Sequence, residues 1–164
     1  MLAANPVGTP LDLNVQLEPN PDDTSGNRSN SFACILGKLQ WVANATRLDI
    51  AYAINKLATY TTNPSLQNVT TLKRILRYLT RTKNFGITYQ INTNNNNSIS
   101  NSTNLFFGYA DAVYANADEL KSTSGYVFLA SGGAITWKSK KQSTRALSST
   151  VAEYIAISEA GHEI

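Results

Sequence analysis

Residues 125–138, GYVFLASGGAITWK, carry the clearest structural signal in the chain. Two apolar runs rich in aromatic and branched side chains, GYVFLA (125–130) and AITWK (134–138), flank the triplet SGG at 131–133. Such runs are typical of β-strands, and a short Gly-rich link between them is typical of a tight turn. The sequence therefore predicts a β-hairpin.

The segments on either side extend the hairpin into a sheet followed by a helix. Upstream, LFFGYAD (105–111) has the apolar character of another strand. Downstream, two serines and a threonine at 148–150 offer helix-start residues for a helix over 150–163. The expected order is strand, strand, strand, helix.

The first half of the chain has helical periodicity instead. Apolar residues recur at helical spacing over 31–44, 48–61 and 66–82, and GITYQI (86–91) then resembles a short strand. The stripes comprise Ile35, Leu39 and Val42, then Ile50, Ala53, Ile54 and Leu57, then Leu72, Ile75, Leu76 and Leu79.

These patterns divide the chain into four expected parts and an α/β (α+β) fold class. Residues 1–30 are rich in Pro, Asn, Asp and Ser and predict an extended or disordered lead-in. Residues 31–91 form a helical segment, and residues 92–104 form an Asn-rich flexible linker. Residues 105–164 form a mixed sheet with a packed helix.

Composition excludes several classes of protein. The chain has 164 residues, and 42% are apolar, which suffices for a core. It has no apolar run of membrane-spanning length and no secretory signal pattern, so we expect an intracellular location, in cytoplasm or nucleus. The chain has one cysteine, Cys34, so internal disulfides and Cys-rich zinc sites are excluded, and we expect this thiol to be buried and inert. It has one histidine, His162, to which we assign no role, so a multi-histidine metal site is excluded as well.

Charge is mildly positive but segregated along the chain. The net charge is +3, residues 1–24 contain only acidic charges, and two basic clusters lie within 66–83 and 138–145. Clusters of this kind suggest a polyanion partner such as nucleic acid, but charge alone favours the alternative of a solvated helix face and a basic loop. The candidate nucleic-acid-binding residues are Lys73, Arg74, Arg77, Arg81, Lys138, Lys140, Lys141 and Arg145.

Two carboxylates stand at positions suited either to structure or to chemistry. Asp111 closes the predicted strand 105–111, and the residues alone favour a strand-end turn over a catalytic role. Glu153 follows Thr150 by three residues, which is the spacing of a helix capping box. The alternative is that both residues supply hard oxygen ligands to Mg²⁺.

The run 109–163 closely resembles the ribonuclease H region of copia-type LTR-retrotransposon Pol polyproteins. The segments KSTSGY (121–126) and WKSKKQ (137–142) match patterns of that family without gaps. The stretches TRLDIAYAINKL (46–57) and LKRILRYLTRTKNFGITY (72–89) resemble the preceding segment, which connects reverse transcriptase to ribonuclease H.

The resemblance implies roles that the residues alone only allowed. Asp111 matches the family's first catalytic aspartate, and Glu153 matches its catalytic glutamate on the following helix. In the family these carboxylates help to bind two Mg²⁺ ions that cleave the RNA strand of an RNA–DNA hybrid. The expected cofactor is therefore Mg²⁺, and the expected partner is hybrid or other nucleic acid rather than a membrane.

Departures from the family pattern limit this expectation. The family's later carboxylates have no counterpart, so we expect the isolated chain to be C-terminally truncated, to bind Mg²⁺ weakly if at all, and to be inactive. The strand 105–111 would then be an exposed sheet edge that promotes self-association. The alternatives are a non-catalytic nucleic-acid-binding or interaction module, and a decayed element copy.

Overall fold

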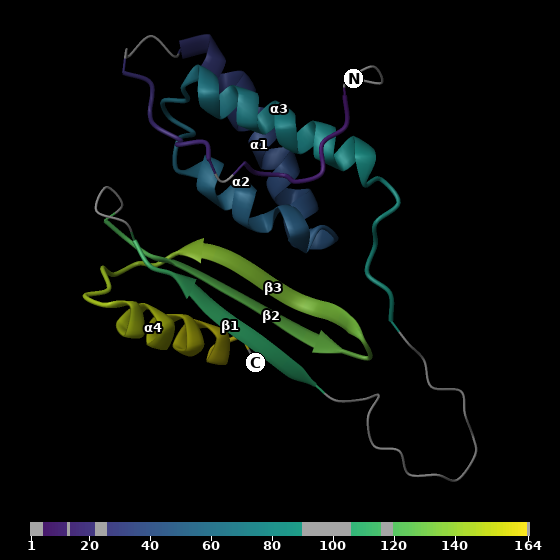
Figure 1. Cartoon of the computed structure of the whole chain (residues 1–164), viewed down its shortest axis with the longest axis vertical. Coiled ribbons are helices and arrows are strands. Elements are labelled where there is room, and N and C mark those ends of the chain that lie inside the picture. Colours follow the sequence, from purple (N-terminus) through teal and green to yellow (C-terminus); the bar gives the residue numbers. More distant parts are fainter. Residues whose placement is uncertain (1–4, 13, 22–25, 90–105, 116–119, 164) are drawn as a thin grey trace. The chain divides into compact units, whose positions relative to one another are not determined.

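The computed structural model describes residues 5–12, 14–21, 26–89, 106–115 and 120–163. The chain divides into two compact units, Met1–Gly86 and Ile87–Ile164, which we call the helical unit and the sheet unit (Figure 1). The α+β fold class is confirmed. The expected Asn-rich linker at 92–104 lies outside the described residues.

The helical unit contains α1 (Gly26–Ala45), a short 3-10 turn η1 (Leu48–Ile50), α2 (Ala51–Ala58) and α3 (Leu66–Arg81) (Figure 1). Helix α1 begins at Gly26, five residues before the predicted start at 31. A tertiary contact supports this early start, since the Ser29 hydroxyl donates to the Thr61 carbonyl at 2.9 Å. The composition around Ser29 does not indicate such a contact, so it could not be predicted from the local sequence.

In the helical unit, the second and third of the three predicted apolar stripes are largely buried and are confirmed. The central residues of the second and third stripes are buried, and α1 contributes Phe32, Leu36, Leu39 and Ala43. The predicted α1 stripe is partly wrong, because Ile35 is exposed and the buried side is rotated toward Phe32. Cys34 is therefore exposed, and the expectation of a buried thiol is wrong.

The segment before α1 runs antiparallel along α3. Asn5 lies at Arg77, Thr9 at Arg74 and Glu18 at Asn68, and a β-bridge joins Pro19 to Pro64. The segment also has a buried apolar contact, because Leu17 is only 8% exposed. Its described residues therefore form an extended strap on the helical unit.

The sheet unit contains an antiparallel sheet in the order β1 (Phe107–Val113), β2 (Thr123–Ala130) and β3 (Gly133–Lys141) (Figure 1). The predicted hairpin is confirmed. Its two-residue turn has positive φ at Ser131 (50°) and Gly132 (80°), the backbone that matches the twist of paired strands. The described sheet is antiparallel rather than mixed, since parallel pairs need a long crossover connection.

The strand predicted at 86–91 is wrong for its described residues, because 86–89 lie outside the sheet. A side chain joins this segment to the sheet, since the Tyr89 hydroxyl donates to the Ala134 carbonyl at 2.7 Å. The Tyr89 ring lies against Gly133, where a Cβ would come within 2.7 Å of it. Gly133 is thus required by close packing.

Helix α4 (Ser149–Gly161) covers one face of the sheet and packs on β1 and β2 (Figure 1). Its buried positions are Ala152, Ala156 and Ala160, spaced by four residues. Tyr126 and Phe128 form the small core beneath it with Ala160. The Phe128 ring crosses Gly108, where a Cβ would lie 2.3 Å from the ring, so only glycine fits without repacking.

A buried glutamine joins the end of β3 to the start of α4. The Gln142 side-chain amide donates to the Ser124 hydroxyl at 3.0 Å and to the Ala152 carbonyl at 2.9 Å. Gln142 is 1% exposed. The last residue of the WKSKKQ motif therefore has a structural role, which is to fix α4 at one end of the sheet.

Candidate functional site

Asp111 lies inside β1 rather than at its end. It is the fifth residue of a seven-residue strand and pairs with Gly125 of β2. The strand-end turn interpretation is therefore wrong, because β1 continues to Val113 and its side chains keep alternating. The carboxylate is exposed, and its Oδ1 accepts a hydrogen bond from the Ala112 backbone N–H at 2.9 Å.

The Asp111 side chain lies on the sheet face opposite α4. Its neighbour Ala110 packs with Tyr126 and Ala160 on the helix-covered face. Successive side chains of a strand point to opposite faces, so Asp111 shares the other face with Tyr109. Across Gly125 on that face the next residue is Ser139 of β3.

Glu153 is not part of a capping box. The cap of α4 is Ser148, whose hydroxyl accepts from the Val151 N–H at 3.2 Å, so Val151 occupies the position a capping-box glutamate would need. Only Ser148 of the three adjacent hydroxyl residues can be the cap, because it has the extended backbone, with φ −152° and ψ 165°. The capping-box interpretation is wrong, and Glu153 is available for another role.

Helix geometry places Glu153 on the β1 side of α4. Glu159 and His162 line a cavity together with Lys138 of β3, so that flank of α4 faces β3. Glu153 is about 120° from Glu159 around the helix axis, at roughly 100° per residue. It therefore lies on the other flank, which faces β1.

The two carboxylates meet the same end of β1 from opposite faces. Gln142 connects Ala152 to Ser124, and Ser124 pairs with Ala112. The residues next to Glu153 and Asp111 are thus at one level of the sheet. Within the described part of the chain, no group of three or more His, Cys, Asp or Glu side chains is arranged to hold a metal ion.

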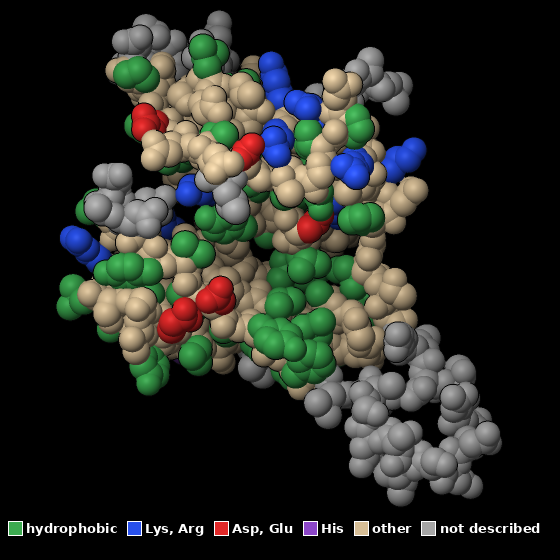
Figure 2. Space-filling view, viewed as in Figure 1, with side chains coloured by type: hydrophobic (Ala, Val, Ile, Leu, Met, Phe, Trp, Pro, Cys, Tyr) green, Lys and Arg blue, Asp and Glu red, His purple; other side chains and the backbone are tan. Residues whose placement is uncertain are grey.

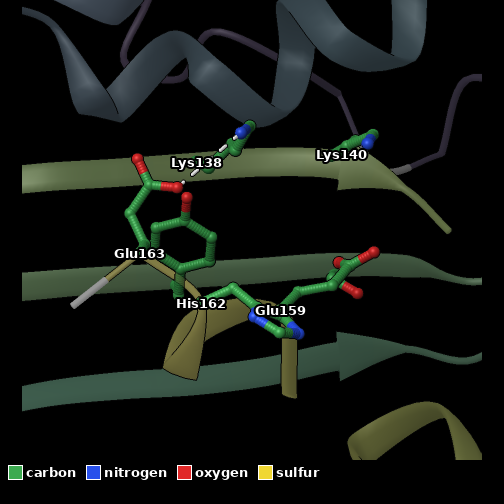
Figure 3. A pocket seen from close by; sticks show the side chains of 7 residues that line it. Lys138, Lys140, Glu159, His162 and Glu163 are labelled. Carbon is green, nitrogen blue, oxygen red and sulfur yellow. Dashed lines mark ion pairs between the residues drawn. The ribbon is translucent and has the colours of Figure 1, made fainter. Parts of the chain in front are cut away.

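The structure separates the basic residues of β3. Lys138 and Lys140 line a cavity of about 170 Å³ on the face covered by α4 (Figure 3). Lys138 Nζ lies 3.9 Å from a carboxylate oxygen of Glu163. Lys141 alternates to the face that carries Asp111, and Arg145 is exposed in the segment after β3. These four residues do not form a single surface.

The same cavity contains a buried phenol. Burial raises the pKa of Tyr126, and the neighbouring carboxylates of Glu163 and Glu159 raise it further. The phenol therefore stays protonated at neutral pH. It belongs to the wall of the cavity and lies on the opposite face from Asp111.

Part of the basic face of α3 is occupied by the chain itself. Arg74 donates to the Thr9 carbonyl at 3.2 Å and to its hydroxyl at 2.9 Å, and it lies 3.5 Å from the Asp12 carboxylate. Arg77 donates to the Asn5 carbonyl at 2.7 Å. Lys73 and Arg81 are exposed, and Lys and Arg side chains are visible over this unit in Figure 2. One acidic residue of the N-terminal segment, Asp12, thus pairs with a basic residue of α3.

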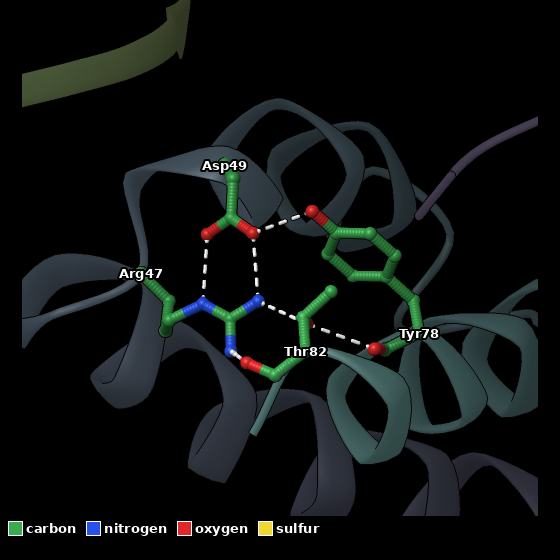
Figure 4. Close-up of polar contacts among 4 residues, drawn as sticks. All are labelled: Arg47, Asp49, Tyr78 and Thr82. Atoms are coloured by element: carbon green, nitrogen blue, oxygen red, sulfur yellow. Dashed lines mark hydrogen bonds and ion pairs between the residues drawn. The ribbon is translucent and has the colours of Figure 1, made fainter. Parts of the chain in front are cut away.

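Sequence reasoning missed an ion pair in the helical unit that joins buried Arg47 to the more exposed Asp49 (Figure 4). Arg47 donates from Nε and Nη2 to the two carboxylate oxygens of Asp49 at 2.9 and 2.7 Å. It also donates to the carbonyl and hydroxyl of Thr82 at 3.0 and 2.6 Å. Tyr78 completes the network by donating to Asp49 at 2.8 Å. The signal was present, because all four residues fall in the two motif-bearing stretches at 46–57 and 72–89.

The network alters the protonation of its members. Burial alone would raise the pKa of Asp49, but the hydrogen bonds from Arg47 and Tyr78 outweigh it and lower that pKa. The hydrogen bond to Asp49 raises the pKa of Arg47. Burial and the Asp49 carboxylate raise the pKa of Tyr78. The pair therefore stays ionised at neutral pH and has a structural role.

Comparison with known proteins places these motifs in a wider context. The chain is 36% identical over 170 residues to the retrovirus-related Pol polyprotein from transposon TNT 1-94 of Nicotiana tabacum, and 35% identical over 165 residues to that from transposon RE1 of Arabidopsis thaliana. Both matches cover 100% of the chain. Over its full length the chain is thus similar to a segment of retrotransposon Pol polyproteins. This Pol segment spans 12% and 10% of the two polyproteins.

A shorter relative matches the same Pol segment over most of its own length. It is the secreted RxLR effector protein 161 of Plasmopara viticola, 38% identical over 133 residues, which are 80% of the chain and 87% of that protein. No family model matches the chain, and no solved structure matches it. None of the described helices combines the length and the apolar character that crossing a bilayer requires.

Proposed function

We propose that the sheet unit is a ribonuclease H-class part of a Pol polyprotein, whose lineage chemistry is metal-dependent hydrolysis of RNA in RNA–DNA hybrids. One observation carries the proposal. The fold brings Asp111, in the first strand, and Glu153, in the first turns of the following helix, to the same end of β1. These are the two residues that matched the family's catalytic carboxylates.

The residues present do not fit a complete two-ion site. Carboxylate oxygens are suitable Mg²⁺ ligands, and Asp111 is exposed. A two-metal site, however, clamps both the attacking and the leaving oxygen and needs a converging set of ligands. Asp111 and Glu153 lie on opposite faces, and the described residues offer no third metal ligand beside them. We therefore expect the chain alone not to cleave hybrid.

A gel assay tests the expected inactivity. Labelled RNA–DNA hybrid is incubated with purified chain in Mg²⁺, Mn²⁺ or EDTA, beside Asp111→Asn. We expect no cleavage above the EDTA control in any sample. Metal-dependent cleavage that disappears in Asp111→Asn would contradict the inactivity and show that the site is completed in another way.

The class assignment has a test of its own. Weak Mn²⁺ binding at Asp111 should broaden the backbone NMR signal of Ala112, and Asp111→Asn should abolish the broadening. Glu153→Gln and Glu159→Gln should both leave the broadening unchanged, because α4 lies on the other face of the sheet from Asp111. If Ala112 is not broadened at millimolar Mn²⁺, or is broadened equally in Asp111→Asn, the assignment of Asp111 as a metal ligand is wrong.

A second candidate function is non-catalytic binding of nucleic acid. The exposed side chains of Lys73 and Arg81 on α3, and of Lys83 just after it, favour this function. Binding of hybrid should then weaken steeply with salt and survive Asp111→Asn. Each Lys73→Ala or Arg81→Ala change should reduce the salt slope by about one. Lys38→Ala, at an exposed position of α1, is the matched control. Equal effects of all three changes on the salt slope would contradict a defined α3 interface.

A further inference from the structure

Four basic side chains form a stripe along α3. They lie within about 100° of arc around the helix axis, at roughly 100° per residue, and they extend over about 12 Å, at roughly 1.5 Å per residue. The stripe comprises Lys73, Arg74, Arg77 and Arg81, and α3 contains no acidic residue. Lys73 and Arg81 are exposed, whereas Arg74 and Arg77 between them are half-buried. Only the two ends of this row of positive charge are therefore fully open to solvent.

The strap covers the middle of the stripe with oxygen acceptors. The carbonyl and the hydroxyl of Thr9 accept from Arg74 at 3.2 and 2.9 Å, and the Asp12 carboxylate lies 3.5 Å from the same guanidinium. The Asn5 carbonyl accepts from Arg77 at 2.7 Å. A phosphate group binds a guanidinium in the same way, because it offers several oxygen acceptors together with a negative charge. The strap thus takes the place that phosphates would occupy on these two arginines.

The inner end of the strap, residues 14–21, is firmly anchored. Its Leu17 side chain is buried. Side chains of the helical unit donate to three of its backbone carbonyls, at 2.6, 2.9 and 2.9 Å in partly buried positions; the donors are Tyr60, Asn63 and Asn68. A buried apolar contact and hydrogen bonds that are partly shielded from water hold this end in place.

The outer end of the strap, residues 5–12, is held more weakly, and we call it the outer strap. None of its residues is buried, and the hydrogen bonds that Arg74 and Arg77 donate to it are exposed. Exposed ion pairs and hydrogen bonds contribute little net stability, since water competes for both partners. A turn separates the outer strap from the anchored end, because the Val15 N–H donates to the Asp12 carbonyl at 3.2 Å. The outer strap can therefore leave α3 while the inner end stays bound.

We propose that the outer strap is an autoinhibitory cover, and that a nucleic-acid strand displaces it by placing phosphates on Arg74 and Arg77. The proposal rests on the second candidate function, which is nucleic-acid binding by α3. Lys73 and Arg81 stand at the two ends of the covered pair and give the strand its first contacts. Opening of the cover then increases the cations available to the strand from two to four. The apparent dissociation constant rises as the fraction of open chains falls, so the cover weakens binding.

Fluorescence anisotropy of labelled RNA–DNA hybrid with the full chain tests the proposal. Asp12→Asn should lower the dissociation constant about two- to fivefold, because it removes the carboxylate from Arg74 and favours the open chain. Glu18→Gln is the matched control, since it removes the same charge from the anchored end, where the backbone carbonyl of Glu18 bonds to Asn68. This control should change the constant by less than about 1.5-fold, because it alters only distant, screened charge.

A double-mutant cycle shows whether Asp12 acts through Arg74. In an Arg74→Ala background, Asp12→Asn should no longer strengthen binding, because the guanidinium that the carboxylate covers is absent. A gain of the same size in both backgrounds would mean that Asp12 only repels the phosphates, and would overturn the proposal. Equal effects of Asp12→Asn and Glu18→Gln in the otherwise unchanged chain would overturn it as well.

NMR follows the outer strap directly. On saturation with hybrid, the backbone amide signals of Thr9 and Asp12 should move to random-coil positions, while the signal of Leu17 keeps its position. If hybrid binds and the Thr9 signal does not move, the cover is wrong although nucleic-acid binding stands. If neither the unchanged chain nor Asp12→Asn binds hybrid even at low salt, nucleic-acid binding by α3 is wrong, and the cover with it.

Discussion

Replacing Arg47 by methionine tests whether the partly buried Arg47–Asp49 ion pair stabilises the helical unit. Arg47 is 7% exposed, and its guanidinium donates to Asp49 and to Thr82. Methionine fills much of the aliphatic volume but donates nothing. The Thr82 carbonyl then loses a donor in a buried position, and the Asp49 carboxylate loses its counter-ion.

The magnitude follows from the exposure of the groups left behind. Breaking a buried ion pair costs about 3–5 kcal/mol, since one charge stays without compensation. The Asp49 side chain is 32% exposed, so water can replace part of the lost interaction. We therefore expect a loss at the lower end, about 3 kcal/mol of the free energy of unfolding of this unit. A domain of ordinary stability survives such a loss in a weakened state.

Native-state hydrogen exchange measures this loss unit by unit. A loss of about 3 kcal/mol should lower the protection of α3 amides by roughly 150-fold, while β2 amides keep their protection. Arg81→Met, the same change at an exposed position of α3, should alter the protection of α3 amides by about twofold at most. If Arg47→Met leaves α3 protection within threefold of the unchanged chain, the network contributes little and the reasoning is refuted.

Three other changes probe local packing, capping and ionisation. Gly108→Ala places a methyl group against the Phe128 ring and should lower the free energy of unfolding of the sheet unit by about 1–3 kcal/mol in urea. Gly37→Ala, on α1 with open space around it, should instead raise the free energy of unfolding by up to about 1 kcal/mol. Ser148→Ala should cost about 1 kcal/mol by the same measurement and Thr150→Ala almost nothing; equal losses would contradict the assigned cap. Because the pKa of Asp49 is lower in the folded chain than in the unfolded chain, where it is about 3.9, the ionised carboxylate stabilises the fold above that pH. This stability is lost as the pH falls through the lower pKa of the folded chain. Asp49→Asn should therefore make the urea midpoint fall less steeply below about pH 4.

Features with a short-range cause could be predicted from the sequence. The hairpin turn needs positive φ at two adjacent residues, and the SGG triplet indicates this directly. The α2 stripe with Ile50, Ile54 and Leu57 repeats at the helical period, and all three residues are 0% exposed. Each signal is contained within a dozen residues, so periodicity and turn chemistry were sufficient.

Features decided by distant partners could not be predicted in this way. The early start of α1 depends on Ser29 reaching Thr61, 32 residues away. The basic residues Arg74 and Arg77 looked available because their partners lie in the strap, 65 and 72 residues away. The capping box failed for a different reason, since three adjacent hydroxyl residues offered equivalent caps and only the backbone at Ser148 distinguishes them.

The antiparallel strap sets an order of events during synthesis. Its contacts to α3 span 50 to 72 residues, as between Glu18 and Asn68 or Asn5 and Arg77, so they form only after α3 has left the ribosome. The β2–β3 hairpin, in contrast, closes through a two-residue turn soon after its second strand emerges. Within the helical unit, the strap is thus translated before α3 but is among the last parts to find its place.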